Sequence, residues 1–275
     1  MPSSHLSSAS SKIPALLEPY VLDGAATRHD GSLTLVTSIQ GAAANWLILR
    51  YLFALLASKK DEPEEQDKAG VVLVSFMRDG AFWRDGCSRL GLDLEACRQA
   101  GRFTFVDGLT GMFAAKPAAP GPDVVLPSTK VDEISAHISK VVAGIKSSRK
   151  VLIIDQMDAL LAVGGDSVDA LKLQNMTLAL RENVFSTVIT LAADSPLIQE
   201  QTTTLEREHA SLSLGMAHAA DEVLSLRKLD TGAAGDVSGV MRISSSTEGR
   251  GADASVEVLY HVLGDGSVKV FERGS

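Results

Sequence analysis

Ser32-Leu33-Thr34-Leu35-Val36-Thr37-Ser38-Ile39-Gln40-Gly41-Ala42-Ala43-Ala44-Asn45 is the stretch that decides the fold of this chain. Residues 32–38 are mostly apolar or β-branched and predict a buried strand. Ile39 to Ala44 are mostly small and predict a turn, and an apolar helix is expected from Asn45 onward. A strand that passes through a short turn into a helix is the repeating unit of parallel α/β sheets. We therefore expect an α/β fold.

The same unit has the form of a phosphate-binding loop but lacks its chemistry. A working loop, G-x-x-x-x-G-K-[ST], uses glycines so that backbone N–H groups can surround the phosphates, a lysine for their charge and a hydroxyl for magnesium. In this chain Ser38 and Ala43 stand at the two glycine positions, Ala44 at the lysine and Asn45 at the serine or threonine. Gly41 is the one glycine between them. The chain has no lysine between Lys12 and Lys59. We therefore predict a degenerate nucleotide site.

A second part of a nucleotide site is a carboxylate at the end of a buried strand. Lys150-Val151-Leu152-Ile153-Ile154-Asp155 is an apolar run ending in an acid, which is how a central strand presents an aspartate to magnesium. A buried strand closed by a turn-forming aspartate has the same pattern, so both interpretations stay open. The catalytic carboxylate expected after the strand 71–76 is missing, because Phe76 and Met77 occupy its place. We predict no catalytic residue, no metal site, no cofactor and no enzymatic activity.

The composition is that of a globular, acidic chain. It has 275 residues, a formal net charge of -8, 45% hydrophobic residues and 22% charged residues, with a pI near 5.3. The negative charge argues against nucleic-acid binding by the chain on its own. Cys87 and Cys97 lack a CxxC pair or histidine cluster, so we expect neither zinc nor disulfides but reduced thiols of an intracellular protein. The serine-rich N-terminus lacks the apolar segment of a signal peptide or anchor.

The helix expected from Ala44 to Ala57 is apolar on every side except at Arg50. A membrane-spanning helix needs about 20 residues, and this run is shorter and is followed at once by charged residues, so no membrane contact is expected. A helix that is apolar all round must be covered on all sides. We expect the sheet and another protein chain to cover it, with Trp46 and Arg50 at a subunit interface.

The remaining elements follow from the same periodicities. Further strands are expected at 102–107, 187–192, 221–226, 239–244, 255–263 and 267–271. A helix is expected at 129–145, with loops at 58–70, at 112–129 and along the polar connection 194–208. The pattern predicts a mainly parallel sheet flanked by helices, with a C-terminal antiparallel meander. It forms a single domain at 31–275 after a flexible segment at 1–30.

Four segments resemble, in their order and spacing, one protein family. They are Leu33–Ser38 running into Gly41–Leu47, Val74–Asp79 with Phe82–Trp83, Ala193–Leu197, and Leu226–Gly232. From about Leu33 to Phe271 the chain resembles Elongator complex protein six of the fungal type. The resemblance implies a RecA-like domain without Walker motifs that assembles with Elongator proteins four and five into a heterohexameric ring. It also implies that the ring binds tRNA and supports modification of the wobble uridine, U34, by the catalytic Elongator subunits, in the cytoplasm and also in the nucleus.

The resemblance further suggests where partners and RNA bind. In RecA-like rings the strand after the long connection carries basic residues toward the neighbouring subunit, and here it ends in Arg227 and Lys228. An exposed basic pair at a strand end is an equal alternative, and Lys228 stands where related subunits often have proline. Loops after the third and fourth core strands face the channel of such rings, and the first, 162–166, is too acidic to hold phosphate. The residues expected to contact tRNA are Gln199, Gln201, Thr202, Thr203, Thr204, Arg207 and His209.

Two other classes of function remain as alternatives. A nucleotide hydrolase with an unusual phosphate cradle would keep Asp155 as a metal ligand, but the lysine and the second-strand carboxylate are missing. A RecA-like recombination-mediator paralogue would bind single-stranded DNA, but the acidic pI and the lack of a basic and aromatic stripe weigh against it. The polar connection also has a simpler interpretation as a solvated surface loop.

Overall fold

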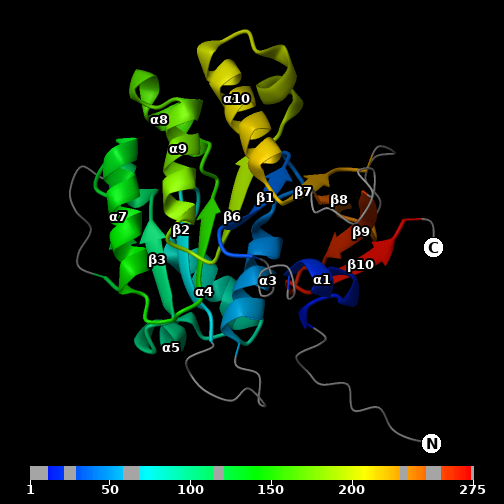
Figure 1. Ribbon diagram of the computed structural model, residues 1–275. Helices are drawn as coiled ribbons and strands as arrows, with labels where there is room; N and C mark the ends of the chain where they lie inside the picture. Colours follow the sequence, from blue (N-terminus) through cyan, green and yellow to red (C-terminus); the bar gives the residue numbers. More distant parts are fainter. Residues whose placement is uncertain are drawn as a thin grey trace, which may run out of the picture.

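The computed structural model describes residues 12–21, 29–57, 68–113, 121–229, 235–245 and 255–273. In this part of the chain ten strands form one sheet, in the order β10-β9-β8-β7-β1-β6-β5-β2-β3-β4 (Figure 1). The strands are β1 (Ser32–Ser38), β2 (Gly70–Ser75), β3 (Phe103–Asp107), β4 (Val124–Val125), β5 (Lys150–Asp155), β6 (Ser186–Ala192), β7 (Glu222–Arg227), β8 (Gly239–Ser245), β9 (Val256–Val262) and β10 (Val268–Glu272).

Two kinds of pairing divide the sheet at β7. From β7 through β1, β6, β5, β2 and β3 to β4, each strand is parallel to its neighbour. From β7 through β8 and β9 to β10, the neighbours are antiparallel. β7, predicted as the first strand of the meander, therefore belongs to both halves because it also pairs with β1. The predicted mainly parallel sheet with a C-terminal antiparallel meander is confirmed.

Helices cover both faces of the sheet (Figure 1). On one face are α3 (Asn45–Leu56), α4 (Gly80–Arg89) and α5 (Leu94–Gln99), and on the other are α7 (Val131–Gly144), α8 (Ala159–Val163), α9 (Ala170–Arg181) and α10 (Thr204–Ala219). Side chains alternate across a strand, so β1 sends Val36 into the first core and Leu33 and Leu35 into the second. The helix predicted at 129–145 is confirmed as α7. The short α6 (Thr110–Phe113) follows β3.

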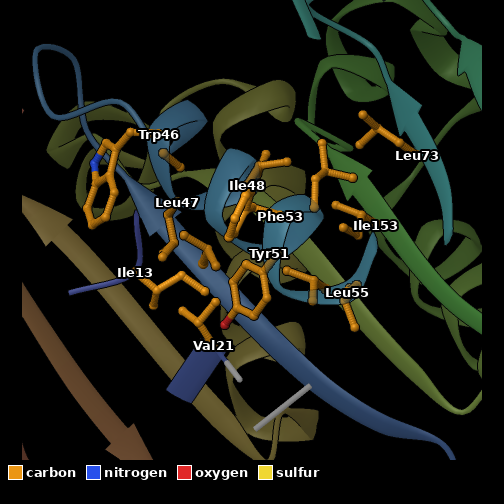
Figure 2. Close-up of a cluster of buried hydrophobic side chains, with 14 of the residues drawn as sticks. Ile13, Val21, Trp46, Leu47, Ile48, Tyr51, Phe53, Leu55, Leu73 and Ile153 are labelled. Carbon is orange, nitrogen blue, oxygen red and sulfur yellow. The ribbon is translucent and has the colours of Figure 1, made fainter. Parts of the chain in front are cut away.

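The N-terminal segment is part of the core. Residues Ala15–Leu17 form a 3-10 turn and Glu18–Val21 form α1. Ile13, Leu17 and Val21 are buried in the same core as α3, and Figure 2 shows Ile13 and Val21 beside Leu47 and Tyr51. Residues 12–21 therefore pack as part of the domain, contrary to the flexible segment expected at 1–30. Residues 1–11 and 22–28 of that segment lie outside the described residues.

The chain itself covers α3. Trp46 is 7% exposed, and its ring centroid lies 5.0 Å from that of Tyr260 on β9. Arg50 is 1% exposed and donates from Nη2 to the Gly266 carbonyl, in the turn between β9 and β10, at 2.7 Å. The interface expected at these two residues is thus already filled by the C-terminal hairpin. The meander folds back over a helix more than 200 residues earlier, so Trp46 and Arg50 are covered within the chain itself.

The polar connection after β6 is structured. Pro196–Glu200 forms one turn of π-helix, and α10 begins at Thr204. The Thr203 side chain accepts a hydrogen bond from Glu206 N at 3.2 Å, and Glu206 Oε2 accepts from Thr203 N at 2.7 Å. This reciprocal capping box satisfies backbone donors at the start of the helix. The flexible loop predicted at 194–208 is therefore wrong for most of its length.

The loops expected at 58–70 and 112–129 are described only in part. In the loop expected at 112–129, Val124 and Val125 form the edge strand β4, paired with β3. Residues 58–67 and 114–120 lie outside the described residues. Among the described helices, none combines the length and apolar character that crossing a bilayer requires.

Candidate functional site

The turn between β1 and α3 closes on itself. Ala42 N donates to the Ile39 carbonyl at 2.9 Å, and Gly41 has a φ of 87°. That backbone conformation favours glycine. The following helix begins after Ala44, whose side chain makes no capping hydrogen bond. The turn thus uses a backbone donor for its own closure and offers no side-chain charge at the lysine position.

A lysine from another strand lies over this turn. A Cβ atom added at Gly41 would collide with the Lys228 side chain and would lie 2.8 Å from its Nζ. Lys228 follows directly after β7, which is parallel to β1, so the pairing of these strands brings the lysine to the turn. Gly41 is therefore required both for its φ and for the space that Lys228 occupies.

Asp155 is fixed between two neighbouring strands. It is 1% exposed, Ser75 Oγ on β2 donates to its Oδ2 at 2.8 Å, and Thr190 Oγ1 on β6 donates to its Oδ1 at 3.0 Å. Burial raises the pKa of this carboxyl from 3.8 to about 6, against the lowering effect of the two hydroxyl hydrogen bonds. Each oxygen of this carboxylate already accepts one hydrogen bond from a neighbouring strand. Asp155 thus links the carboxyl ends of β2, β5 and β6.

The place of the catalytic carboxylate is filled by packing and capping groups. Ser75 Oγ, besides its bond to Asp155, accepts from Arg78 N at 3.0 Å. Phe76 is buried, and Asp79, the first acid after β2, accepts from Phe82 N at 2.9 Å as the cap of α4. These contacts orient no carboxylate toward a water molecule at the end of β2. Among the described residues no cluster of three or more histidine, cysteine, aspartate or glutamate side chains suits a metal ion.

A cavity of about 600 Å³ lies beside the turn, between β1, β7, α10 and the segment after β6. Its polar lining includes Thr37, Gln40, Asp194, Ser195, Gln199, Ser213, Ser225 and Lys228. Its apolar lining includes Ile39, Pro196, Ile198, Leu214, Ala217 and Val223. The sequence interpretation missed it because the loop predicted at 194–208 included the first turn of α10, and no helix was predicted for the rest of this wall. The visible signal was Thr203 followed three residues later by Glu206, which marks the start of a helix.

A larger cavity, of about 790 Å³, lies at the amino ends of the parallel strands. It contains Arg149, Lys150 and Arg181, with Asp30 and Glu182 as opposing charges. Arg181 is already held there by the Gly31 carbonyl, to which its Nε donates at 2.8 Å. In open α/β sheets ligands bind outside the carboxyl ends of the strands. The candidate functional site therefore lies at the carboxyl ends of the parallel strands, which we call the carboxyl edge. It consists of the β1–α3 turn, Asp155 and the smaller cavity.

Comparisons with known proteins agree on both fold and family. A KaiC-like protein of the hyperthermophilic archaeon Pyrococcus horikoshii superposes with a TM-score of 0.57 at 16% identity, over 95% of this chain and 97% of that one. This likeness confirms the predicted RecA-like fold. A protein of Schizosaccharomyces pombe named Elongator complex protein 6 homolog is 24% identical over 255 residues, covering 88% of this chain and 92% of the relative. Residues 22–262 match the family described as Elongation complex protein 6.

The chain belongs to the Elongation complex protein 6 family.

Membership of this family confirms the resemblance found in the sequence and assigns the chain to the Elongator complex. Of the two residues proposed for an interface at the end of β7, Arg227 donates to Glu257 on β9 at 2.7 Å, so its charge is offset within the chain. Lys228 is exposed beside the turn. The structure therefore brings Lys228, and not Arg227, to the degenerate nucleotide site of this family member.

The residues expected to contact tRNA separate into an exposed set and a buried one. Gln199, Gln201, Thr202, Thr203, Thr204 and Arg207 are exposed around the start of α10. His209 is 3% exposed, and its Nε2 lies 3.2 Å from Asp158 Oδ2, which also accepts from Ala192 N. His209 therefore holds α10 against the β5–α8 turn and does not reach the surface. Its expected RNA contact is wrong for this structure, because one helical turn places position 209 on the inner face of α10.

Proposed function

We propose that this chain is a non-catalytic subunit of Elongator, in a heterohexameric RecA-like ring with Elongator proteins four and five. The observation that carries the proposal is the state of the carboxyl edge. Ala44 stands at the lysine position, the turn is closed by its own backbone, and both oxygens of Asp155 accept hydrogen bonds from neighbouring strands. A RecA-like domain in this state has lost the groups that bind and hydrolyse ATP. Its remaining role is to complete an assembly.

A ring role is supported by the family and by what the carboxyl edge still presents. Away from the turn, Met77 and Phe82 are exposed large apolar side chains near the end of β2. Arg78 lies with its guanidinium carbon 5.2 Å from the centroid of the Phe82 ring. Methionine, aromatic residues and arginine are enriched at protein interfaces. We place the contact with a neighbouring ring subunit at this edge.

The ring would bind tRNA and support U34 modification by the catalytic Elongator subunits, in the cytoplasm and also in the nucleus. This chain has a net charge of -8, so partner subunits would supply most of the positive surface. Its own share would come from the exposed residues before and at the start of α10. Thr202 to Thr204 and two glutamines offer hydrogen bonds, and Arg207 offers one charge.

Two measurements on purified protein test the proposal. Native mass spectrometry after co-expression with Elongator proteins four and five should show a mixed hexamer that requires this chain. Titration of magnesium-ATP into the isolated chain should show no saturable binding, because Ala44 supplies no charge to the phosphates. The non-catalytic assignment is refuted by micromolar ATP binding that is abolished in Asp155→Ala. The ring assignment is refuted by failure to co-purify with either partner.

A further inference from the structure

The cavity beside the β1 turn has a polar floor and an apolar wall. Its floor includes Thr37 and Ser225, which face each other on β1 and β7, with Thr37 Oγ1 donating to Ser225 Oγ at 3.0 Å. Its wall includes Ile39, Ile198 and Leu214. Leu214 is 60% exposed. A flat apolar group in the cavity would bury part of this surface.

The rim carries groups that can recognise the edge of a heterocycle. Gln40 and Gln199 each have a side-chain amide there; Gln199 Oε1 already accepts from Ser195 Oγ at 3.0 Å, and its NH₂ group can donate to a ligand. Asp194 joins them, and its Oδ1 accepts from Gln40 N at 2.9 Å, which fixes the rim. Its second oxygen can accept from a ligand. Paired donors and acceptors of this kind bind the edges of unstacked bases.

Lys228 supplies one positive charge at the end of the cavity next to the turn. A lysine ammonium is a compact point charge that suits a phosphate. With Asp194 as the one acid, the lining has no excess charge for a polyanion but can hold a single phosphate near Lys228. The volume, about 600 Å³, lies within the usual range for small-molecule sites. It is open to one nucleotide but cannot enclose a duplex.

We propose that this cavity holds one unstacked nucleotide of a bound RNA. The base lies against Ile198 and Leu214, its edge meets Gln40 and Gln199, and its phosphate lies at Lys228. The inference rests on the RNA role proposed above and gives it a location. Gln199 both lines the cavity and belongs to the exposed set around the start of α10, so the cavity continues the surface assigned to RNA. This continuity favours a nucleotide over a side chain of a neighbouring subunit.

The test is a methyl-NMR titration of the full isolated chain with uridine monophosphate, uridine and inorganic phosphate in parallel. We expect the monophosphate to shift the methyl signals of Ile39, Ile198 and Leu214. Lys228→Ala should weaken the monophosphate about tenfold, the value of one charged hydrogen bond, and leave uridine unchanged. Lys269→Ala is the matched control, because Lys269 is an exposed lysine on the distant edge strand β10. It should change neither ligand.

Three results overturn the inference. One is the absence of these shifts at ligand concentrations up to about 10 mM, which would mean a Kd weaker than about 10 mM. Another is an equal effect of inorganic phosphate, which would make this an anion site without base recognition. The third is that the cavity methyls respond to Elongator protein four or five and not to nucleotides. If one of these three results is found and the ring still forms and binds tRNA, the cavity inference alone is refuted. A chain that enters no ring, or a ring that binds no tRNA, would refute the proposed function.

Discussion

Replacing Asp155 by asparagine should stabilise the protein at neutral and alkaline pH. The carboxylate is buried, and burial raises its pKa from 3.8 to about 6. Each pKa unit is worth about 1.4 kcal/mol, so the ionised aspartate costs the folded state about 3 kcal/mol at pH 8. Between pH 3.8 and 6 the folded state binds more protons than the unfolded state, so this cost grows as pH rises through that window. Asparagine has the same shape and no charge.

Rearrangement of hydrogen bonds reduces the stabilisation expected from Asp155→Asn. Ser75 and Thr190 both donate to Asp155, and one of these hydroxyls must turn to accept from the new amide. If that loses about 1 kcal/mol, the net stabilisation at pH 8 is about 2 kcal/mol, and about half of the charge term has gone at pH 5. Urea unfolding at the two pH values measures this, with Asp236→Asn at an exposed turn position as the control. A variant that is less stable than the parent by the same amount at both pH values would refute the reasoning.

Four further outcomes follow from the contacts. Leu17→Ala should lower the free energy of unfolding by about 2 to 4 kcal/mol because Leu17 is fully buried beside α3. An unchanged urea midpoint would instead support the prediction that the N-terminal segment is flexible. Thr203→Ala should cost about 1 kcal/mol by removing the capping box, measured by urea unfolding against Thr204→Ala, whose side chain lies outside the capping box; equal losses in both would contradict it. Charge reversal at Lys228 should weaken tRNA binding by the ring more than reversal at Arg227 and leave ring assembly intact, and native mass spectrometry showing that the rings are lost would instead place Lys228 at a subunit interface. Arg207→Ala should flatten the salt dependence of tRNA binding by the ring by roughly one unit, and an unchanged slope would show that α10 begins outside the RNA site.

Local patterns predicted most of the strands, and tertiary contacts account for what was missed. β1 and β5 have the predicted bounds because their apolar runs are buried on both faces of the sheet. α10 was missed because its inner face includes His209 and Ser213, which weaken the apolar stripe. Their burial is possible because His209 lies against Asp158, a residue 51 positions earlier. A contact of that kind leaves no local periodicity.

The candidate site was predicted in its residue types but not in its contacts. The missing lysine and the acid at Asp155 could be read directly from the sequence. The bonds that hold Asp155 come from Ser75 and Thr190, on strands that become neighbours only in the folded sheet. The cover of Trp46 and Arg50 likewise comes from the far end of the chain. The sequence therefore indicated which nucleotide-binding residues are missing, whereas only the structure showed which contacts occupy their places.

The replacements make the loss of phosphate binding difficult to reverse by a single substitution. A lysine introduced at Ala44 would meet a turn already closed between Ile39 and Ala42, with Lys228 lying over Gly41. Asp155 would still be buried and hydrogen-bonded to Ser75 and Thr190. The remaining acid, Asp155, joins β2, β5 and β6 through these bonds. In this chain contacts within the fold occupy the positions that serve catalysis in a RecA-like ATPase, which is why we look for its binding surface beside those positions, in the cavity next to α10.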